Sequence, residues 1–256
     1  MQNLDPAYYT DPKVYEREQQ AVFWNTWQLI GPFSLVQSAG EYLATEIAGA
    51  KVFVIRDHAG ELRAFRNVCR HRGARLLPEG TGRCRTIRCP YHGWVYDLAG
   101  RLQRTPWFGD QPGLDRENWP LVEISVAVWR GLVFVSIHHC QSLDLQLGDA
   151  IGELAPEPID TYLLTDQRRL VFDANWKIYT DNFVEGYHVP GIHPEFFAAV
   201  DFQRFETTVR QNMVRMTAPI RGELFYRGKW LWMWPNWTLS FFSGGMSTSR
   251  INPLGC

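Results

Sequence analysis

The strongest constraint on this chain is a pair of short motifs that each combine a cysteine with a histidine. One residue separates Cys69 from His71, two residues separate Cys89 from His92, and 17 residues lie between the motifs. Thiolate sulfur and imidazole nitrogen are ligands of both zinc and iron–sulfur centres. The spacing predicts one metal centre, and two types stay open: a structural zinc ion with four protein ligands, or a two-iron cluster with two ligands on each iron.

The residues around the motifs favour the two-iron cluster. The stretches 69–76 (CRHRGARL) and 89–102 (CPYHGWVYDLAGRL) resemble the Rieske domain of ring-hydroxylating oxygenases. The resemblance implies a [2Fe–2S] Rieske cluster that uses the cysteines on one iron and the histidines on the other. Its ligands would be Cys69, Cys89, His71 and His92.

The remaining cysteines are not expected to bind the cluster. Five cysteines occur, at positions 69, 84, 89, 140 and 256, and Cys84 is expected to be a free thiol that is buried or half-buried. Rieske proteins of the respiratory type carry an extra disulfide between the two cluster loops, but Ala74 and Tyr91 stand at the corresponding positions here. The oxygenase type is therefore expected, with a potential in the lower part of the Rieske range, about −150 mV.

A second candidate site lies in residues 175–196 (NWKIYTDNFVEGYHVPGIHPEF). His188 and His193 are five residues apart, which on an uninterrupted α-helix separates them by about 140°. Pro190 and Gly191 lie between them and are expected to break the helix, so that both imidazoles reach one metal. Two histidines and one carboxylate form the ligand set of non-heme Fe(II) oxygenases, and two unrelated surface histidines are the alternative.

The same stretch resembles the catalytic domain of the oxygenase α subunits. The resemblance implies that His188 and His193 bind a mononuclear Fe(II), and that Glu185 is the bridging carboxylate that links this iron to a Rieske histidine. Asn182 matches a family position near the iron. The family's third iron ligand is an aspartate that is expected beyond residue 256, so the catalytic domain is expected to be incomplete at its C-terminus, with uncertain activity.

The fold expected from the sequence is α+β. Residues 1–35 are expected to form an N-terminal helical segment, with a helix over 7–30, that packs on the catalytic domain. Residues 36–145 read as a small antiparallel β Rieske domain, because short runs rich in β-branched and aromatic residues alternate with glycine-containing turns. Residues 146–256 are expected to form the incomplete helix-grip-type catalytic domain, including a strand just before Asn175.

Composition excludes several classes of function. The chain has 256 residues, a formal net charge of −1 and 45% hydrophobic residues, which allows a sizeable core and gives no sign of nucleic-acid binding. The N-terminus is too polar for a signal peptide, and no apolar run approaches the roughly 18 residues that span a bilayer. A soluble cytoplasmic protein that binds neither nucleic acid nor membrane is expected.

The resemblance implies a terminal oxygenase that hydroxylates or demethylates a small organic substrate with O2. Electrons would come from NAD(P)H through a ferredoxin or a flavin/iron–sulfur reductase, and the expected assembly is a homotrimer, possibly with a β subunit. The likeness is greatest to the choline-monooxygenase and betaine-demethylase branch, which indicates a quaternary ammonium substrate. Residues 230–237 (WLWMWPNW) could offer cation–π contacts or serve in packing alone.

Four alternatives remain. An aromatic-ring dioxygenase of aromatic hydrocarbon catabolism would share both sites. A truncated, inactive oxygenase would keep only Rieske electron transfer. A Rieske ferredoxin or a zinc-binding interaction module would need the first site alone.

Overall fold

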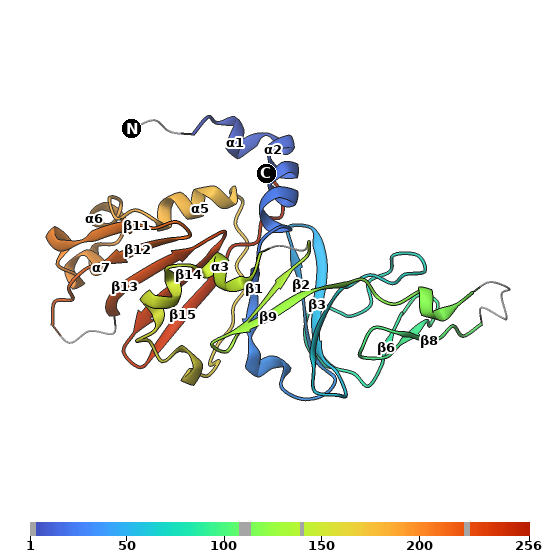
Figure 1. The fold of residues 1–256 in the computed structure, drawn as a ribbon. Coiled ribbons are helices and arrows are strands. Elements are labelled where there is room, and N and C mark those ends of the chain that lie inside the picture. Colours follow the sequence, from blue (N-terminus) through green and yellow to red (C-terminus); the bar gives the residue numbers. More distant parts are fainter. Residues whose placement is uncertain (1–3, 108–113, 139–140, 223–225) are drawn as a thin grey trace. The chain divides into compact units, whose positions relative to one another are not determined.

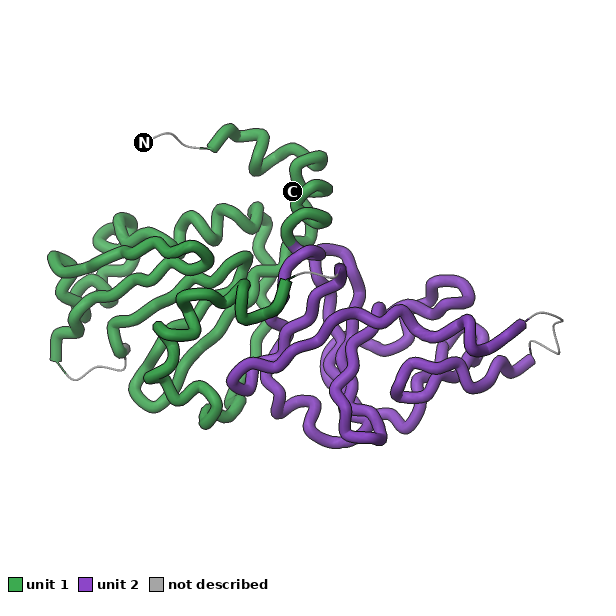
Figure 2. Tube along the Cα trace, viewed as in Figure 1, with its two compact units in different colours: residues 1–22, 141–256 green, residues 23–140 purple. Residues whose placement is uncertain are grey.

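The computed structural model describes residues 4–107, 114–138, 141–222 and 226–256. The chain divides into two compact units (Figure 2): residues 1–22 with 141–256, and residues 23–140. Both units contain antiparallel sheets, and the first also carries most of the helices, so the α+β class is confirmed. The divisions fall after residues 22 and 140, whereas 35 and 145 were expected, because residues 28–32 join a sheet of the second unit.

The second unit, residues 23–140, contains two antiparallel sheets (Figure 1). The larger has the strand order β1-β10-β9-β4-β3-β2-β5. Its strands are β1 (Gln28–Pro32), β2 (Glu41–Ile47), β3 (Ala50–Arg56), β4 (Leu62–Arg66), β5 (Gly80–Arg83), β9 (Glu123–Trp129) and β10 (Leu132–Ser136). The smaller sheet contains β6 (Ile87–Arg88), β7 (Val95–Tyr96) and β8 (Leu102–Arg104), and two 3-10 turns cover Phe33–Val36 and Arg116–Asn118.

One hydrophobic cluster joins the two sheets of this unit. Phe53 and Phe65 contribute from adjacent strands of the larger sheet, and Ile87 contributes from the smaller sheet. Cys69 and Cys89 belong to the same buried cluster, each only 2% exposed. The loops that carry the candidate ligands are therefore anchored in the core of the unit, although their histidines lie nearer the surface.

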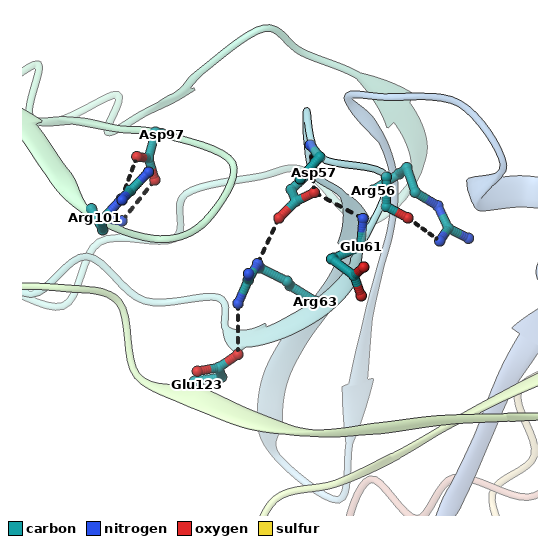
Figure 3. A network of polar contacts seen from close by, with 9 residues as sticks. Arg56, Asp57, Glu61, Arg63, Asp97, Arg101 and Glu123 are labelled. Atoms are coloured by element: carbon teal, nitrogen blue, oxygen red, sulfur yellow. Dashed lines mark hydrogen bonds and ion pairs between the residues drawn. The ribbon is translucent and has the colours of Figure 1, made fainter.

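Two hairpin turns of this unit are built alike (Figure 3). Asp57, between β3 and β4, and Asp97, between β7 and β8, each accept the backbone N–H of the residue four places later at 2.9 Å. Each carboxylate also accepts an arginine Nε–H, from Arg63 at 2.7 Å and from Arg101 at 2.8 Å. Aspartate side chains of this kind close tight turns, and here they fix the register of the strands on either side.

The first unit combines short helices with a five-stranded antiparallel sheet. The helices are α1 (Ala7–Thr10), α2 (Pro12–Glu18), a π-helical turn (Gln19–Phe23), α3 (Leu143–Leu147), α4 (Ala150–Leu154), α5 (Trp176–Phe183), α6 (Val189–Ile192) and α7 (Pro194–Ala199), with 3-10 turns at Ile159–Thr161 and Phe202–Arg204. The strands follow chain order: β11 (Glu206–Val209), β12 (Met213–Thr217), β13 (Tyr226–Met233), β14 (Trp237–Phe242) and β15 (Gly245–Arg250). No helix in the described ranges has both the length and the apolar character needed to cross a membrane.

The N-terminal helical segment begins where it was expected and ends earlier than expected. The Asp11 side chain accepts the backbone N–H of Lys13 at 2.8 Å and so caps α2, with Pro12 in the first turn. The helix expected over 7–30 is wrong beyond Phe23, because residues 28–32 form β1 and pair with β10. Backbone pairing with a neighbouring strand has overridden the helical spacing of apolar residues in this part.

The N-terminal helices are tied to α5 by a nearly buried ion pair. Glu18 accepts the Lys177 ammonium at 2.8 Å and the Trp176 indole N–H at 2.8 Å. The Asn175 side chain, which caps α5, donates to the backbone carbonyl of Tyr9 at 2.9 Å. The Lys177 and Glu18 side chains are only 10% and 14% exposed, so loss of either would leave the other charge nearly buried without its partner. The contact joins the N-terminal segment of the unit to its second segment.

The strand expected just before Asn175 is not formed. Residues 162–174 have no regular secondary structure, and Leu163, Leu170 and Phe172 are 81%, 71% and 64% exposed. A strand is stable only when its backbone groups pair with a neighbour, and no strand of the described residues pairs with this segment. The β-branched and aromatic composition was therefore not sufficient to form a strand here.

Candidate metal centres

The two cysteine–histidine motifs form two loops of the same construction, Cys69–Ala74 and Cys89–Trp94. In each loop the cysteine N–H donates to the carbonyl five residues later at 2.8 Å, and the cysteine carbonyl accepts the N–H four residues later at 3.0 Å. The fifth position is a glycine in both loops, with φ of +72° at Gly73 and +71° at Gly93. This left-handed conformation suits glycine and turns each loop back on itself.

The two cysteine side chains meet inside the core of the unit. The Cys69 and Cys89 thiols are within hydrogen-bonding contact of each other, and the Tyr96 hydroxyl lies 3.4 Å from the Cys69 sulfur. Burial raises the pKa of the Cys69 thiol, so the metal-free thiol is protonated at neutral pH. A bound metal ion would displace this proton, because thiolate is the form that binds metals.

The two histidines form a second pair, carried by the same two loops as the cysteines. The ring centroids of His71 and His92 are 4.6 Å apart. The His71 ring stacks on the Trp94 ring with a centroid distance of 4.8 Å, and the ring centroids of Tyr91 and His92 are 3.8 Å apart. Nδ1 of both histidines is buried, and that of His92 has no hydrogen-bond partner within the described part of the chain. Burial, followed by the charges of His92 and Arg72, lowers the pKa of His71 and so favours the neutral imidazole that binds metals.

These pairs fit a two-iron cluster better than a single zinc ion. A buried imidazole nitrogen without a partner and two buried thiols, carried by the same two loops, are groups whose binding capacity a bound metal centre would satisfy. Across the described ranges, no three His, Cys, Asp or Glu side chains form a ready group for a metal ion, so the cysteines and the histidines are two separate pairs in this structure. A [2Fe–2S] Rieske centre needs two thiolates for one iron and two imidazoles for the other, which matches the observed pairs.

The other cysteines lie as the sequence indicated. Cys84 is a half-buried free thiol, which confirms that expectation, and burial raises its pKa. Its backbone pairs with Gly40 through an N–H to carbonyl bond of 3.0 Å. Cys256 is free and exposed, whereas Cys140 lies outside the described residues.

The second candidate site is formed just after α5. The rings of His188 and His193 have centroids 5.2 Å apart and planes at 79°. One carboxylate oxygen of Glu185 contacts Nδ1 of His188, while the other accepts the backbone N–H groups of Tyr187 and His188. This carboxylate fixes the orientation of the His188 ring and leaves its Nε2 for a metal, as outer carboxylates do in many metal sites.

The two histidines are brought together in a different way from the one expected. Pro190 and Gly191 do not break a helix, because Val189–Ile192 form the single turn α6 with Pro190 near its start. Proline is compatible with the first turn of a helix, where its missing N–H has no partner to lose. The chain instead leaves the helical path at Val184, after α5, and again at His193, whose φ and ψ are −123° and 66°.

The remaining polar candidates lie apart from the histidines. Asn182 is exposed on α5, and its side chain makes no hydrogen bond to other described residues. Asp181 accepts the Tyr9 hydroxyl at 2.7 Å, and Asp201 pairs with Arg221 at 3.5 Å. Both aspartates therefore have structural partners, and the identity of the third iron ligand stays a prediction.

An aromatic cluster packs behind the second site. Phe205 leaves no room for a side chain at Gly186, because a Cβ there would lie 2.7 Å from its ring. Phe196 and Phe205 contact Trp230 at centroid distances of 5.1 and 6.4 Å, and Trp230 is 9% exposed. Packing is therefore the role of Trp230, and half-buried Trp232 is the better candidate for cation–π contacts.

Sequence reasoning missed Tyr96, the residue whose hydroxyl contacts the Cys69 sulfur. A signal was present in residues 94–98 (WVYDL), a run of aromatic and apolar residues in which Trp94, Val95, Tyr96 and Leu98 are all buried. Which sulfur the hydroxyl would reach depends on the packing of two loops and was not readable from spacing.

Two protein families match the chain, each within one part of it. Residues 26–115 match the Rieske [2Fe-2S] domain, and residues 159–256 match the catalytic domain of the ring hydroxylating alpha subunit. The chain is thus similar to the alpha subunits of the Rieske oxygenases in both of its parts, which confirms the resemblance drawn from the motifs. The domains imply a [2Fe–2S] cluster and a mononuclear iron that uses O2.

Several known proteins are similar to the chain over most of its length. It is 29% identical to the chloroplastic choline monooxygenase of Amaranthus tricolor over 97% of its own length and 59% of that protein. It is 34% identical to the biphenyl dioxygenase subunit alpha of Paraburkholderia xenovorans, over 87% of its length and 53% of that protein. The chain also superposes on the solved structure of a quaternary ammonium Rieske monooxygenase that concerns carnitine oxidation by gut microbiota, with a TM-score of 0.90. The two are 28% identical, and the match covers 97% of this chain and 71% of that chain.

These comparisons confirm the likeness to the choline-monooxygenase branch. The chain spans about 59% of the length of the choline monooxygenase it matches.

Proposed function

We propose that the chain is the terminal oxygenase component of a Rieske non-heme iron system. Electrons from NAD(P)H would reach it through a ferredoxin or a flavin/iron–sulfur reductase and would be used with O2 to oxidise a small organic molecule. The observation that carries the proposal is the presence, in one chain, of a buried thiol pair beside a histidine pair and of a separate histidine pair held by a carboxylate. The first arrangement suits electron transfer, and the second suits O2 chemistry.

At the first centre, the protein would supply ligands and hydrogen bonds. Cys69 and Cys89 would hold one iron through thiolates, and His71 and His92 would hold the other through their buried Nδ1 atoms. The Tyr96 hydroxyl would donate to the Cys69 sulfur and stabilise the added electron. The bound cluster would accept and release one electron at a time.

At the second centre, His188 and His193 would hold a mononuclear Fe(II), which would supply O2 activation when bound. Glu185 already contacts Nδ1 of His188 and holds this ring in place. The same carboxylate would accept an N–H from a Rieske histidine of a neighbouring subunit and so carry the electron between centres. A third aspartate ligand and a role for Asn182 near the iron stay predictions.

A quaternary ammonium compound is the proposed substrate class. Relatives include a choline monooxygenase and a quaternary ammonium Rieske monooxygenase, which supports a cationic substrate for this chain. The half-buried rings of Trp232 and Trp234, with centroids 6.1 Å apart, offer faces that attract such a cation. An aromatic-ring substrate is the second candidate, supported by the 34% identity to a biphenyl dioxygenase subunit alpha.

The proposed assembly is a homotrimer, in which each Rieske centre serves the catalytic iron of the next subunit. Closed rings of this kind arise from head-to-tail interfaces. The cytoplasmic location stays a prediction, and one of the relatives is a chloroplastic enzyme.

The proposal is tested on purified protein with a reductase, NADH and O2. We expect a brown protein with iron and acid-labile sulfide, a Rieske-type electron paramagnetic resonance (EPR) signal after reduction, and formaldehyde release from an N-methylated quaternary ammonium substrate. His188→Ala should keep the Rieske signal and lose turnover, whereas Cys89→Ser should lose the signal.

Other outcomes would change the assignment. A ring diol from biphenyl in place of formaldehyde would favour the aromatic-ring alternative. A normal Rieske signal without turnover on any substrate would favour an inactive oxygenase that retains electron transfer. A colourless protein that contains zinc would refute the proposal.

A further inference from the structure

Two side chains of the N-terminal segment hold α5 through polar contacts. The Glu18 carboxylate accepts the Lys177 ammonium at 2.8 and 3.0 Å and the Trp176 indole N–H at 2.8 Å. The Tyr9 hydroxyl donates to the Asp181 carboxylate at 2.7 Å, and the Tyr9 ring lies 5.7 Å from the Lys177 ammonium. Tyr9 and Glu18, called the N-terminal clasp below, belong to neither metal centre, yet both contact the helix that precedes the second one.

The clasp holds successive turns of this helix. Lys177 and Asp181 are four residues apart, so they lie on the same face of α5, one turn after the other. Glu185 follows Asp181 by four more residues, and the chain leaves the helical path between them, at Val184. A shift or rotation of α5 would therefore displace Glu185 directly.

The start of α5 is fixed mainly by these polar contacts. The buried residues of the helix are Trp176 and Lys177, which are the two that Glu18 binds, whereas Ile178 is 50% exposed. Phe183 packs against the hydrophobic cluster that contains Trp230, but it lies at the other end of the helix. Apolar packing thus holds the end of α5, and the N-terminal clasp holds its beginning.

The position of Glu185 depends on where α5 ends. The Glu185 side chain is 40% exposed, so packing restrains it little. Its carboxylate contacts Nδ1 of His188 and accepts the backbone N–H groups of Tyr187 and His188, all of them within the same short turn. Because these contacts are local, the turn moves as one body with the end of the helix. A displacement of about 1 Å can lower the rate of a reaction by about a hundredfold.

We propose that Tyr9 and Glu18 are positioning residues for the second metal centre. They set the position of α5 and, through it, the positions of Glu185 and His188. The inference rests on the proposed function, because it adds residues that act on the proposed Fe(II) site. A nearly buried ion pair adds little net stability, because the cost of desolvation offsets the attraction, so its contribution here is a defined geometry.

The first test compares two variants that remove similar ion pairs within the same unit. Glu18→Gln removes the charge of the clasp, where the paired side chains are 14% and 10% exposed. The matched control, Glu153→Gln, acts on the 2.8 Å pair between Glu153 and Lys229, where they are 20% and 18% exposed and which joins α4 to β13.

The probe is Fe(II) alone, added without oxygen to protein that carries its Rieske cluster. Iron at the second site is followed through the EPR signal of its nitric oxide adduct. We expect Glu18→Gln to weaken Fe(II) binding by about tenfold and Glu153→Gln by less than about twofold, because removal of groups that orient metal ligands weakens metal binding by about 10- to 100-fold. The Rieske signal should be the same in both variants and in wild type.

Turnover provides the second test. Glu18→Gln should lower kcat by about tenfold or more and change KM by less than about threefold, because the clasp orients catalytic groups and contacts no substrate. Glu18→Ala, which also removes the acceptor of the Trp176 N–H, should lower kcat further. Tyr9→Phe keeps the ring and loses one hydrogen bond to Asp181, so it should fold normally and lower kcat by about threefold.

The outcomes separate the inference from the proposed function. Equal Fe(II) binding in wild type, Glu18→Gln and Tyr9→Phe would overturn the inference and leave the proposed function in place. Equal losses in Glu18→Gln and Glu153→Gln, with equal falls in the urea midpoint, would identify general destabilisation as the cause and also overturn it. A wild-type protein that binds no Fe(II) at the second site would overturn the proposed function itself.

Discussion

The Tyr96 hydroxyl is placed to tune the potential of the proposed cluster. It lies 3.4 Å from the Cys69 sulfur and accepts the backbone N–H of Arg70 at 3.3 Å, which leaves its own hydrogen free to point at the sulfur. Burial and the neighbouring sulfur raise the pKa of Tyr96, so the hydroxyl keeps its proton across the usual assay range. Tyr96→Phe removes this donor and little else, because the ring is fully buried.

The size of the effect follows from the strength of such a bond. A hydrogen bond to a charged acceptor contributes about 1.5–3 kcal/mol, and only the part that strengthens on reduction, about 1 kcal/mol, changes the potential. For a one-electron couple 59 mV corresponds to a tenfold change in equilibrium constant, so 1 kcal/mol is about 40 mV. We expect Tyr96→Phe to lower the midpoint potential by about 40 mV, because the reduced, more negative cluster loses more stabilisation than the oxidised one.

The measurement is a redox titration followed by the Rieske EPR signal, with iron content determined on each sample. Tyr42→Phe is the matched control, because Tyr42 is buried in the same hydrophobic cluster and makes no hydrogen bond to a candidate ligand. A shift below about 10 mV in Tyr96→Phe, with full iron content, would refute the reasoning that this hydroxyl donates to a cluster sulfur.

Two other predictions concern the two hairpin turns that Asp57 and Asp97 close. Gly60 and Gly100 have φ of +86° and +82°, but a Cβ would meet nothing within 4 Å at Gly60 and would lie 2.5 Å from the Phe65 ring at Gly100. Gly100→Ala should therefore lower the free energy of unfolding by about 3 kcal/mol and Gly60→Ala by about 1 kcal/mol in urea titrations, and equal losses would contradict the steric argument. Burial alone would raise the pKa of Asp57, but hydrogen bonds from Arg63 and backbone N–H groups outweigh it and lower the pKa. The ionised carboxylate thus stabilises the fold above the unfolded-state pKa of about 3.9, and this stabilisation is lost as pH falls through the lower folded-state pKa. Asp57→Asn should therefore lower the free energy of unfolding by about 1–2 kcal/mol at pH 7 and by progressively less in acid. A loss that does not depend on pH would show that the charge is unimportant.

The first metal centre could be predicted from the sequence because its geometry is local. A cysteine and a histidine within one short loop reach the same side of that loop, and glycine at the fifth position allows the return of the chain. Only the contact between the two loops depends on residues far apart in the sequence, and this contact was predicted from the resemblance of the motifs to the Rieske domain.

Elements that depend on distant partners were predicted less well. The helix expected over 7–30 was extended into residues that form β1 (Gln28–Pro32) and pair with β10, about a hundred residues later in the chain. Residues 162–174 show the reverse case, with the composition of a strand and no pairing partner among the described residues. The nearness of His188 to His193 was anticipated, but its cause was misassigned because a one-turn helix that begins near a proline resembles a helix break in sequence.

The two histidine pairs are held by different means, and this difference suits different tasks. The buried nitrogens of His71 and His92 lie against a packed core and are fixed by ring stacking, as a centre that only exchanges electrons requires. His188 is held mainly by the Glu185 carboxylate, and His193 is exposed at the end of one helical turn. A site that must admit O2 and a substrate cannot be enclosed before they arrive, so a carboxylate that orients one ligand while the other stays accessible is the arrangement that such chemistry needs.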